Sequence, residues 1–211
     1  MKTIASLALA AIVTGLCCAE DGQHKIKIIK LTSLIQETPQ FQVAGVKGKR
    51  INPRYWLELE AELEVKTTAP SEFIPVITAH WFAVVKNNFS KPNAGQPVRL
   101  TGRVEFLNIR TKDRTIHISA YIGPDVLEKL TGKDRPNESD IEGIALKIEG
   151  NGIVTDKKEY VEGLVKATAE KKSRWWEKWG KKTLPDAILA KSKTPFALLW
   201  TDRYPAEKLE H

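Results

Sequence analysis

Apolar and polar residues alternate strictly along residues 55–65. Tyr55, Leu57, Leu59, Ala61, Leu63 and Val65 form one series, and Trp56, Glu58, Glu60, Glu62 and Glu64 form the other. A period of two over this length predicts a β-strand with one face in the core and the other in water. We therefore interpret the four glutamates as a solvated face of the strand. Their like charges repel one another and discourage another sheet from stacking on this face.

Three further segments predict strands. Residues 73–85 are apolar on both faces, which is typical of a central strand covered on both sides. Residues 97–109 and 114–122 continue the pattern, and Thr111-Lys112-Asp113 predicts a tight turn between them. Strands of about ten residues separated by Pro, Asn and Gly favour a mainly β, antiparallel sandwich over alternating βα units.

Two local signals interrupt the strand pattern. Pro124 suits the first position of a short helix near residues 124–132, and Gly132 suits its end. Further along, Gly150-Asn151-Gly152 lies between the apolar runs 144–148 and 153–154. Asn-Gly between apolar runs predicts a β-hairpin.

The last third allows more than one interpretation. Apolar positions recur at helical spacing from Val161 to Trp179, which indicates a helix near residues 157–180. A strand over residues 160–165 is the alternative, because Gly163 is unfavourable in a helix. Residues 194–204 predict a closing strand. We therefore expect residues 20–211 to form a single β-sandwich domain that carries a helical, basic, tryptophan-rich segment at about 156–182.

Residues 1–19 have the layout of a secretory signal peptide. Lys2 precedes an apolar run of about 13 residues, which is shorter than the ~20 residues of a membrane-spanning helix. Small residues follow before Glu20. Cleavage after Ala19 is favoured over lipoprotein anchoring at Cys17 or Cys18, because Leu16 is a poor residue to precede an acylated cysteine. The prediction is an exported protein in the periplasm, at the outer membrane or outside the cell, with no transmembrane segment in the mature chain.

Removal of this signal would remove both cysteines. The mature chain would then have no disulfide, no thiolate nucleophile and no cysteine ligand for a metal. The motifs of nucleophile elbows, zinc proteases, phosphate loops and dinucleotide-binding sites are also absent. We predict no catalytic residues, no cofactor and no metal site, and His80 is interpreted as a hydrogen-bonded core or interface residue.

One segment combines charge with aromatic residues. Residues 171–182 hold six basic residues against Glu177 alone, in a chain whose formal net charge is +7. The candidate binding residues are Lys171, Lys172, Arg174, Trp175, Trp176, Lys178 and Trp179. Indoles beside fixed cations suit an anionic polymer, a lipid interface or a protein partner, whereas an exported protein seldom meets nucleic acid. The alternative is that the three indoles cap the core of the sandwich and leave the lysines solvated.

The C-terminal run Lys191-Ser192-Lys193-Thr194-Pro195-Phe196-Ala197, followed by Leu199-Trp200-Thr201-Asp202-Arg203-Tyr204, resembles a recurring ending of secreted proteins in Verrucomicrobia. Asn151-Gly152-Ile153-Val154 and Trp175-Trp176 are similar to the same group. The group is exported and immunoglobulin-like, and it is encoded beside type IV pilus assembly genes in Akkermansia muciniphila. The resemblance implies an immunoglobulin-like sandwich near the cell envelope, with a role in pilus assembly or host contact and no catalytic residues.

Three hypotheses about function follow. The first is a non-enzymatic, exported module that binds an envelope or pilus protein. The second is a binder of an anionic polysaccharide or other polymer through the lysine and tryptophan segment. The third is a hydrolase whose site would be assembled from scattered carboxylates and His80.

Overall fold

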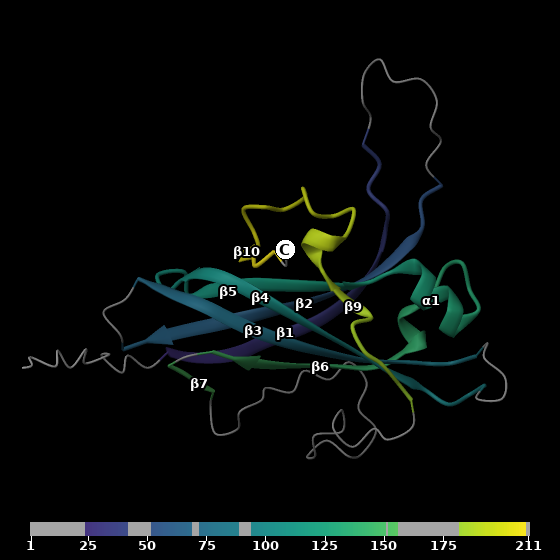
Figure 1. The fold of residues 1–211 in the computed structure, drawn as a ribbon, viewed down its shortest axis with the longest axis horizontal. Coiled ribbons are helices and arrows are strands. Elements are labelled where there is room, and N and C mark those ends of the chain that lie inside the picture. The colour runs from purple at the N-terminus through teal and green to yellow at the C-terminus, as the bar shows by residue number, and fades with distance from the viewer. Residues whose placement is uncertain are drawn as a thin grey trace, which may run out of the picture.

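The fold consists of two β-sheets that enclose one hydrophobic core. The computed structural model describes residues 24–41, 52–68, 72–88, 94–150, 152–155 and 182–209. Buried side chains from both sheets, among them Leu59, Trp81 and Phe106, belong to the same core cluster. The described chain is thus mainly β and arranged as a sandwich, as the strand pattern predicts (Figure 1).

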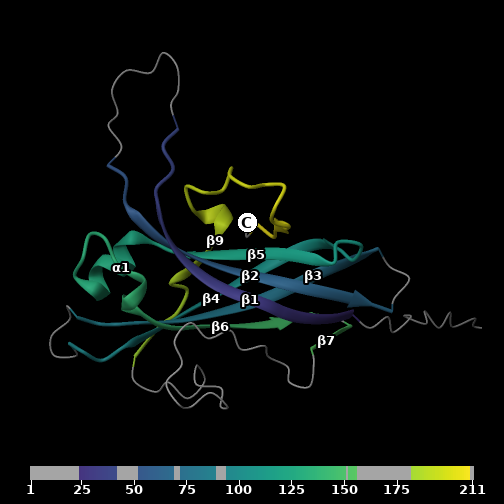
Figure 2. The ribbon, with the colours of Figure 1, turned by 180° about the vertical axis from the view of Figure 1, so that it is seen from behind.

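The first sheet, sheet A, has the strand order β7-β1-β2-β5-β9. Its strands are β1 (His24–Glu37), β2 (Tyr55–Thr67), β5 (Thr115–Ile122), β7 (Ile153–Thr155) and β9 (Ile188–Ala190). The neighbours pair antiparallel except β1 and β7, which run parallel over three residues. In both views the end of β1 and the start of β2 bend away from the other strands (Figures 1 and 2).

The second sheet, sheet B, has the order β10-β4-β3-β6, and β8 also pairs with β4. Its strands are β3 (Phe73–Val85), β4 (Val98–Arg110), β6 (Ile141–Glu149), β8 (Thr183–Leu184) and β10 (Ala206–Glu207). β3 lies between β4 and β6, so the prediction that it is a central strand is confirmed. Its outward face is only partly covered, because Val76 is exposed and His80 and Phe82 are half-buried.

The helix signals at Pro124 and Gly132 are confirmed. Helix α1 (Pro124–Thr131) begins with Pro124 and ends at Gly132, whose φ of 71° is left-handed. The Gly132 N–H donates to the carbonyl of Glu128 at 2.8 Å, which closes the last turn. Leu127 and Leu130 face the core, and a short 3₁₀ turn, η1 (Glu138–Asp140), leads on to β6.

The turn predicted at Thr111-Lys112-Asp113 is confirmed, and it joins β4 to β5, which lie in different sheets. Two other expectations are corrected. Gly150 and Gly152 do form a turn, with Ile153 N–H donating to the Gly150 carbonyl at 3.3 Å, but the strands on either side lie in different sheets and are no hairpin. Residues 194–204 form turns rather than a closing strand, and pairing is confined to β8, β9 and β10 on either side of them. The expected helix at 157–180 lies outside the described residues.

The C-terminal segment joins the two sheets. β8 and β10 pair with β4 of sheet B, whereas β9 pairs with β5 of sheet A. The segment crosses between the sheets at Gly102 of β4, where an added Cβ atom would overlap the backbone carbonyl of Ile188. A glycine is therefore required at residue 102 for β9 to lie so close to β4.

Replacement of Gly102 by alanine tests this contact. We expect Gly102→Ala to lower the free energy of unfolding by about 1–3 kcal/mol, because an added methyl group must displace β9 from a packed interior. Gly123→Ala is the matched control, because its Cβ would meet only the Trp56 ring at an ordinary 3.5 Å. Urea denaturation compares the two variants, and equal losses of stability would contradict the close packing of β9 on β4.

Candidate functional site

Residues 191–205 lie over the outer face of sheet A, where Figure 1 shows the C-terminal segment beside β5. Phe196 anchors this C-terminal loop and is only 1% exposed. Its ring stacks on Tyr121 of β5 with 4.8 Å between centroids, and it meets Trp56 of β2 edge to face at 5.9 Å. These aromatic contacts attach the loop to the sheet.

Hydrogen bonds fix the shape of the C-terminal loop. The Glu207 carboxylate of β10 accepts the backbone N–H groups of Lys191 at 2.9 Å and Ser192 at 2.8 Å, where the 3₁₀ turn η2 (Lys191–Lys193) begins. Lys191 is buried, and its Nζ donates to the carbonyl of Ala197 at 2.9 Å. The start, middle and end of the loop are thus bonded to one another.

Beneath the C-terminal loop lies Glu58, which is only 5% exposed. Its Oε1 accepts hydrogen bonds from Tyr121 Oη at 2.6 Å and Tyr204 Oη at 3.2 Å, and Gln36 donates to its Oε2. Burial raises the pKa of Glu58 above its ordinary value, and the charge of Glu60 raises it further, while the two tyrosine hydrogen bonds oppose the shift. The prediction of a solvated face is therefore wrong at Glu58, because the C-terminal loop covers it.

The neighbouring carboxylate, Glu60, behaves in the opposite way. Burial alone would raise its pKa, but hydrogen bonds from Arg203 and Tyr204 outweigh burial and lower it. Arg203 Nη2 lies 2.8 Å from Glu60 Oε1, and Tyr204 Oη lies 2.5 Å from Glu60 Oε2. Arg203 Nη2 is also 3.2 Å from Nδ1 of His117, on the outer face of sheet A.

A groove of about 300 Å³ opens beside this network. It is lined by Gln36, Glu58, Glu60, Trp200, Arg203 and Tyr204. Trp200 has a backbone φ of 53°, which is costly for a bulky side chain. The residue is 44% exposed, and its ring stacks over that of Phe196 with 6.3 Å between centroids. Leu198, two residues earlier, is 79% exposed. We call Leu198, Trp200 and this groove the Trp200 face.

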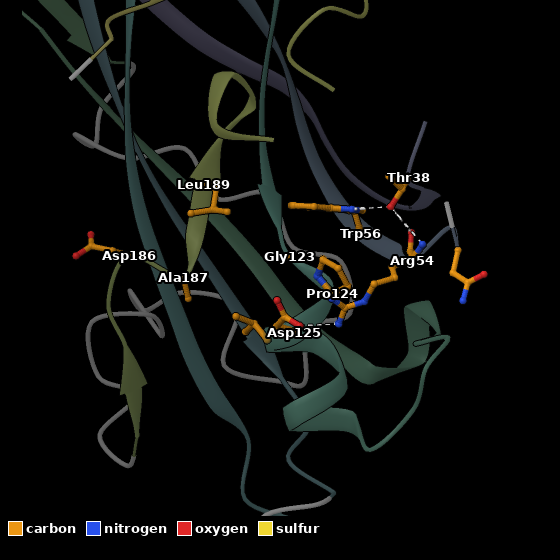
Figure 3. A pocket seen from close by; sticks show the side chains of 11 residues that line it. Thr38, Arg54, Trp56, Gly123, Pro124, Asp125, Asp186, Ala187 and Leu189 are labelled. Carbon is orange, nitrogen blue, oxygen red and sulfur yellow. Dashed lines mark hydrogen bonds and ion pairs between the residues drawn. The ribbon is translucent and has the colours of Figure 1, made fainter. Parts of the chain in front are cut away.

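A second pocket, of about 380 Å³, lies on the side of Trp56 toward α1 (Figure 3). Trp56 Nε1 donates to Thr38 Oγ1 at 3.1 Å, which holds the indole in place. Arg54 spans the rim and pairs with Asp125 at 2.6 Å and Glu128 at 2.9 Å. Its charge is thus matched by carboxylates of α1 and is not presented to a ligand, so this pocket offers less for recognition than the Trp200 face.

The structure describes only some of the residues that were singled out in the sequence. Lys171, Lys172, Arg174, Trp175, Trp176, Lys178 and Trp179 lie outside the described residues. His80 pairs with Glu149 on the outer face of sheet B at 3.0 Å, and His24 contacts Thr67 at 2.9 Å at the start of β1. Within the described segments, no three His, Cys, Asp or Glu side chains gather in a way that would hold a metal ion.

Residues of the C-terminal loop were not predicted to form a site. Tyr204 and Arg203 are more than 140 positions from Glu58 and Glu60, so no local pattern connects them. The one available signal was Trp56, an aromatic residue that heads the series of glutamates on β2. An aromatic side chain on an expected water-facing surface indicates that another segment covers part of that surface.

These observations define a mainly β sandwich whose last residues cover the outer face of one sheet. The chain belongs to the family whose model matches residues 18–211, which is nearly the whole sequence. A crystal structure of a protein from Akkermansia muciniphila is similar, with a TM-score of 0.73 and 20% sequence identity over 90% of this chain and 96% of that chain. At this identity the similarity shows the fold alone, and it confirms the resemblance to an Akkermansia protein at that level. The immunoglobulin-like description stays a prediction.

No curated protein matches the chain. Within the part of the chain that the structure describes, no helix has the length and apolar character needed to cross a membrane.

The opposite pKa shifts of Glu58 and Glu60 predict opposite pH dependences. The raised pKa of Glu58 gives stability that is full below its unfolded pKa of about 4.3 and is lost as pH rises through the folded pKa. Relative to Glu58→Gln, the wild type should therefore be most stable near pH 4 and lose that advantage toward pH 8. Urea denaturation across this range measures the difference.

Glu60→Gln is the matched control. The lowered pKa of Glu60 gives stability that is present above the unfolded pKa and is lost as pH falls through the folded pKa. This variant should be less stable than the wild type by about 1–3 kcal/mol at pH 7, with the difference shrinking in acid. Parallel pH profiles for the two variants would contradict the assignment of the charges.

Proposed function

We propose that the protein is a non-enzymatic, exported module of the cell envelope that binds a protein partner through the Trp200 face. The single observation that carries the proposal is Trp200 itself. Trp200 has a left-handed backbone conformation and is 44% exposed, and it lies on a loop that is bonded at both ends. Strain of this kind is retained where it serves a function, and exposed tryptophans are frequent anchors of protein interfaces.

Export and pilus association rest on the sequence and on the relatives. Residues 1–19 have the pattern of a secretory signal, and the C-terminal run resembles exported proteins encoded beside type IV pilus assembly genes. The family match over residues 18–211 and the shared fold with a protein of Akkermansia muciniphila support the same placement. We therefore propose a binding or assembly role with type IV-like pili or at host contact.

The arrangement of Glu58 and Glu60 supports a binding role over hydrolysis. Both carboxylates come from one strand, and their oxygens are bonded to Tyr121, Tyr204 and Arg203. In most glycoside hydrolases two carboxyl groups flank the bond that breaks, with space between them for the substrate. Here the two lie side by side and serve to hold the C-terminal loop.

A photo-crosslinking amino acid in place of exposed Asp202, expressed in the native host, tests the proposed partner. We expect a crosslinked product with an envelope or pilus assembly protein, and a yield at least tenfold lower after Leu198→Ala or Trp200→Ala, because anchor side chains are lost. Phe73→Ala is the matched control, because Phe73 is also 44% exposed but lies on β3 of sheet B. Unchanged yield in both loop variants, with their melting temperatures preserved, would contradict the proposal.

The second candidate function is binding of an anionic envelope or host polymer. The observation that favours it is the net charge of +5 within residues 171–182, together with three of the six tryptophans. The binding residues would be Lys171, Lys172, Arg174, Trp175, Trp176, Lys178 and Trp179. Such a surface would attract polyanions electrostatically, and its exposed charges would be screened by salt over about 8 Å at physiological strength.

Replacing Trp175, Trp176 and Trp179 by alanine tests this candidate. We expect loss of binding to an anionic polysaccharide with little change in melting temperature, and wild-type binding that weakens as salt is added. Affinity measured by calorimetry at two salt concentrations provides the readout. A large fall in melting temperature would show instead that the indoles cap the core.

A further inference from the structure

Within the described segments, the outward edge of β1 is paired over only a short part of its length. β7 pairs with this edge only at His24, Lys25 and Ile26. Among the described residues, no strand pairs with the edge over residues 27–37, while β2 occupies the other side of β1 throughout (Figure 2). An edge of this length presents a row of backbone donors and acceptors that can template another strand.

Apolar side chains accompany this open edge on both faces. Leu31 and Ile35 point inward and pack against the core, yet both stay half-buried. Leu34 points to the outer face, opposite Glu58 of β2, and is 52% exposed. Lysines protect only the first half of the strand, at Lys25, Lys27 and Lys30. The second half carries the apolar residues, and an added strand there would bury them.

The sequence of β1 is complementary to itself when read in the antiparallel direction. With Ser33 placed opposite Ser33 of the partner subunit, a two-fold axis normal to the sheet keeps inward side chains facing inward. Leu31 then lies opposite the partner's Ile35 on the inner face, and Leu34 lies opposite the partner's Thr32 on the outer face. Each apolar pair occurs twice by symmetry, and such cross-strand pairs stabilise a sheet.

Charge favours the same direction of pairing. β1 runs from Lys27 and Lys30 to Glu37, whose carboxylate is exposed and accepts a hydrogen bond from Tyr55 Oη at 3.0 Å. Antiparallel pairing centred on Ser33 places Lys30 opposite the partner's Gln36 and keeps the lysines of the two strands apart. A parallel arrangement would instead bring lysines beside lysines. Repulsion between the lysines thus favours the antiparallel direction.

We propose that β1 pairs antiparallel with β1 of a second copy, centred on Ser33, so that sheet A of both chains becomes one continuous sheet. This interface adjoins the Trp200 face, because Gln36 of β1 also lines its groove, but it uses the backbone edge of β1 and not the C-terminal loop. It assigns one side of the sandwich to self-association and leaves the C-terminal loop for another partner. The pairing uses backbone hydrogen bonds for affinity and alternate side chains for register.

A cysteine at residue 33 tests the register directly. In the full chain carrying Cys17→Ser and Cys18→Ser, we expect Ser33→Cys to form a disulfide-linked dimer at least tenfold faster than Lys112→Cys, which places a cysteine on the exposed turn after β4. Residue 33 lies on the proposed axis, so the two introduced thiols would face each other within disulfide reach. Equal rates for the two variants would overturn the register.

A charge at residue 34 tests the association in solution. We expect light scattering to show a dimer whose dissociation constant rises at least tenfold in Leu34→Lys, because two like charges would meet near the axis. Val76→Lys is the matched control, because Val76 is also exposed but lies on β3. Hydrogen exchange of residues 28–36 should slow as protein concentration rises. Exchange that is independent of concentration, or a wild type that stays monomeric at millimolar concentration, would overturn the proposal.

Discussion

The pairing of one C-terminal segment with both sheets is the constraint on which the rest of the structure depends. β4 and β5 follow each other in the chain but enter different sheets, so each would carry an open edge. β8 and β10 cover parts of the edge of β4, and β9 covers part of the edge of β5. The same segment then places Phe196 on the outer face of sheet A. The same segment therefore covers the edges of the two sheets and forms the candidate site.

The site beneath the C-terminal loop balances two carboxylates of different character. The buried Glu58 accepts hydrogen bonds from two tyrosines and Gln36 in place of water. The charged form of Glu60 is instead stabilised by Arg203. Burying both as anions would cost far more, because like charges in a poorly hydrated space repel strongly. The cation, Arg203, belongs to the C-terminal loop. The same contact therefore attaches the loop and neutralises the negative charge on the sheet face.

Local pattern predicted the local structure and failed where distant segments meet. The alternation at residues 55–65 identified β2, and Pro124 with Gly132 identified α1. The same alternation misplaced Glu58, because its tyrosine partners come from β5 and the C-terminal loop. At Gly150–Gly152 the turn chemistry was correct, since Gly152 has a φ of 69°, but the strand after it pairs with β1. A turn motif determines the backbone direction over a few residues. It does not determine with which strand, or in which sheet, the following segment pairs.

The order of the strands along the chain also governs when the fold is completed. During synthesis from the N-terminus, β4 and β5 emerge long before β8, β9 and β10, so their uncovered edges persist until residues 183–207 are available. The sandwich has many contacts between distant positions, which form slowly. By the same logic, a chain that ends before residue 206 would keep these edges exposed and invite aggregation or proteolysis.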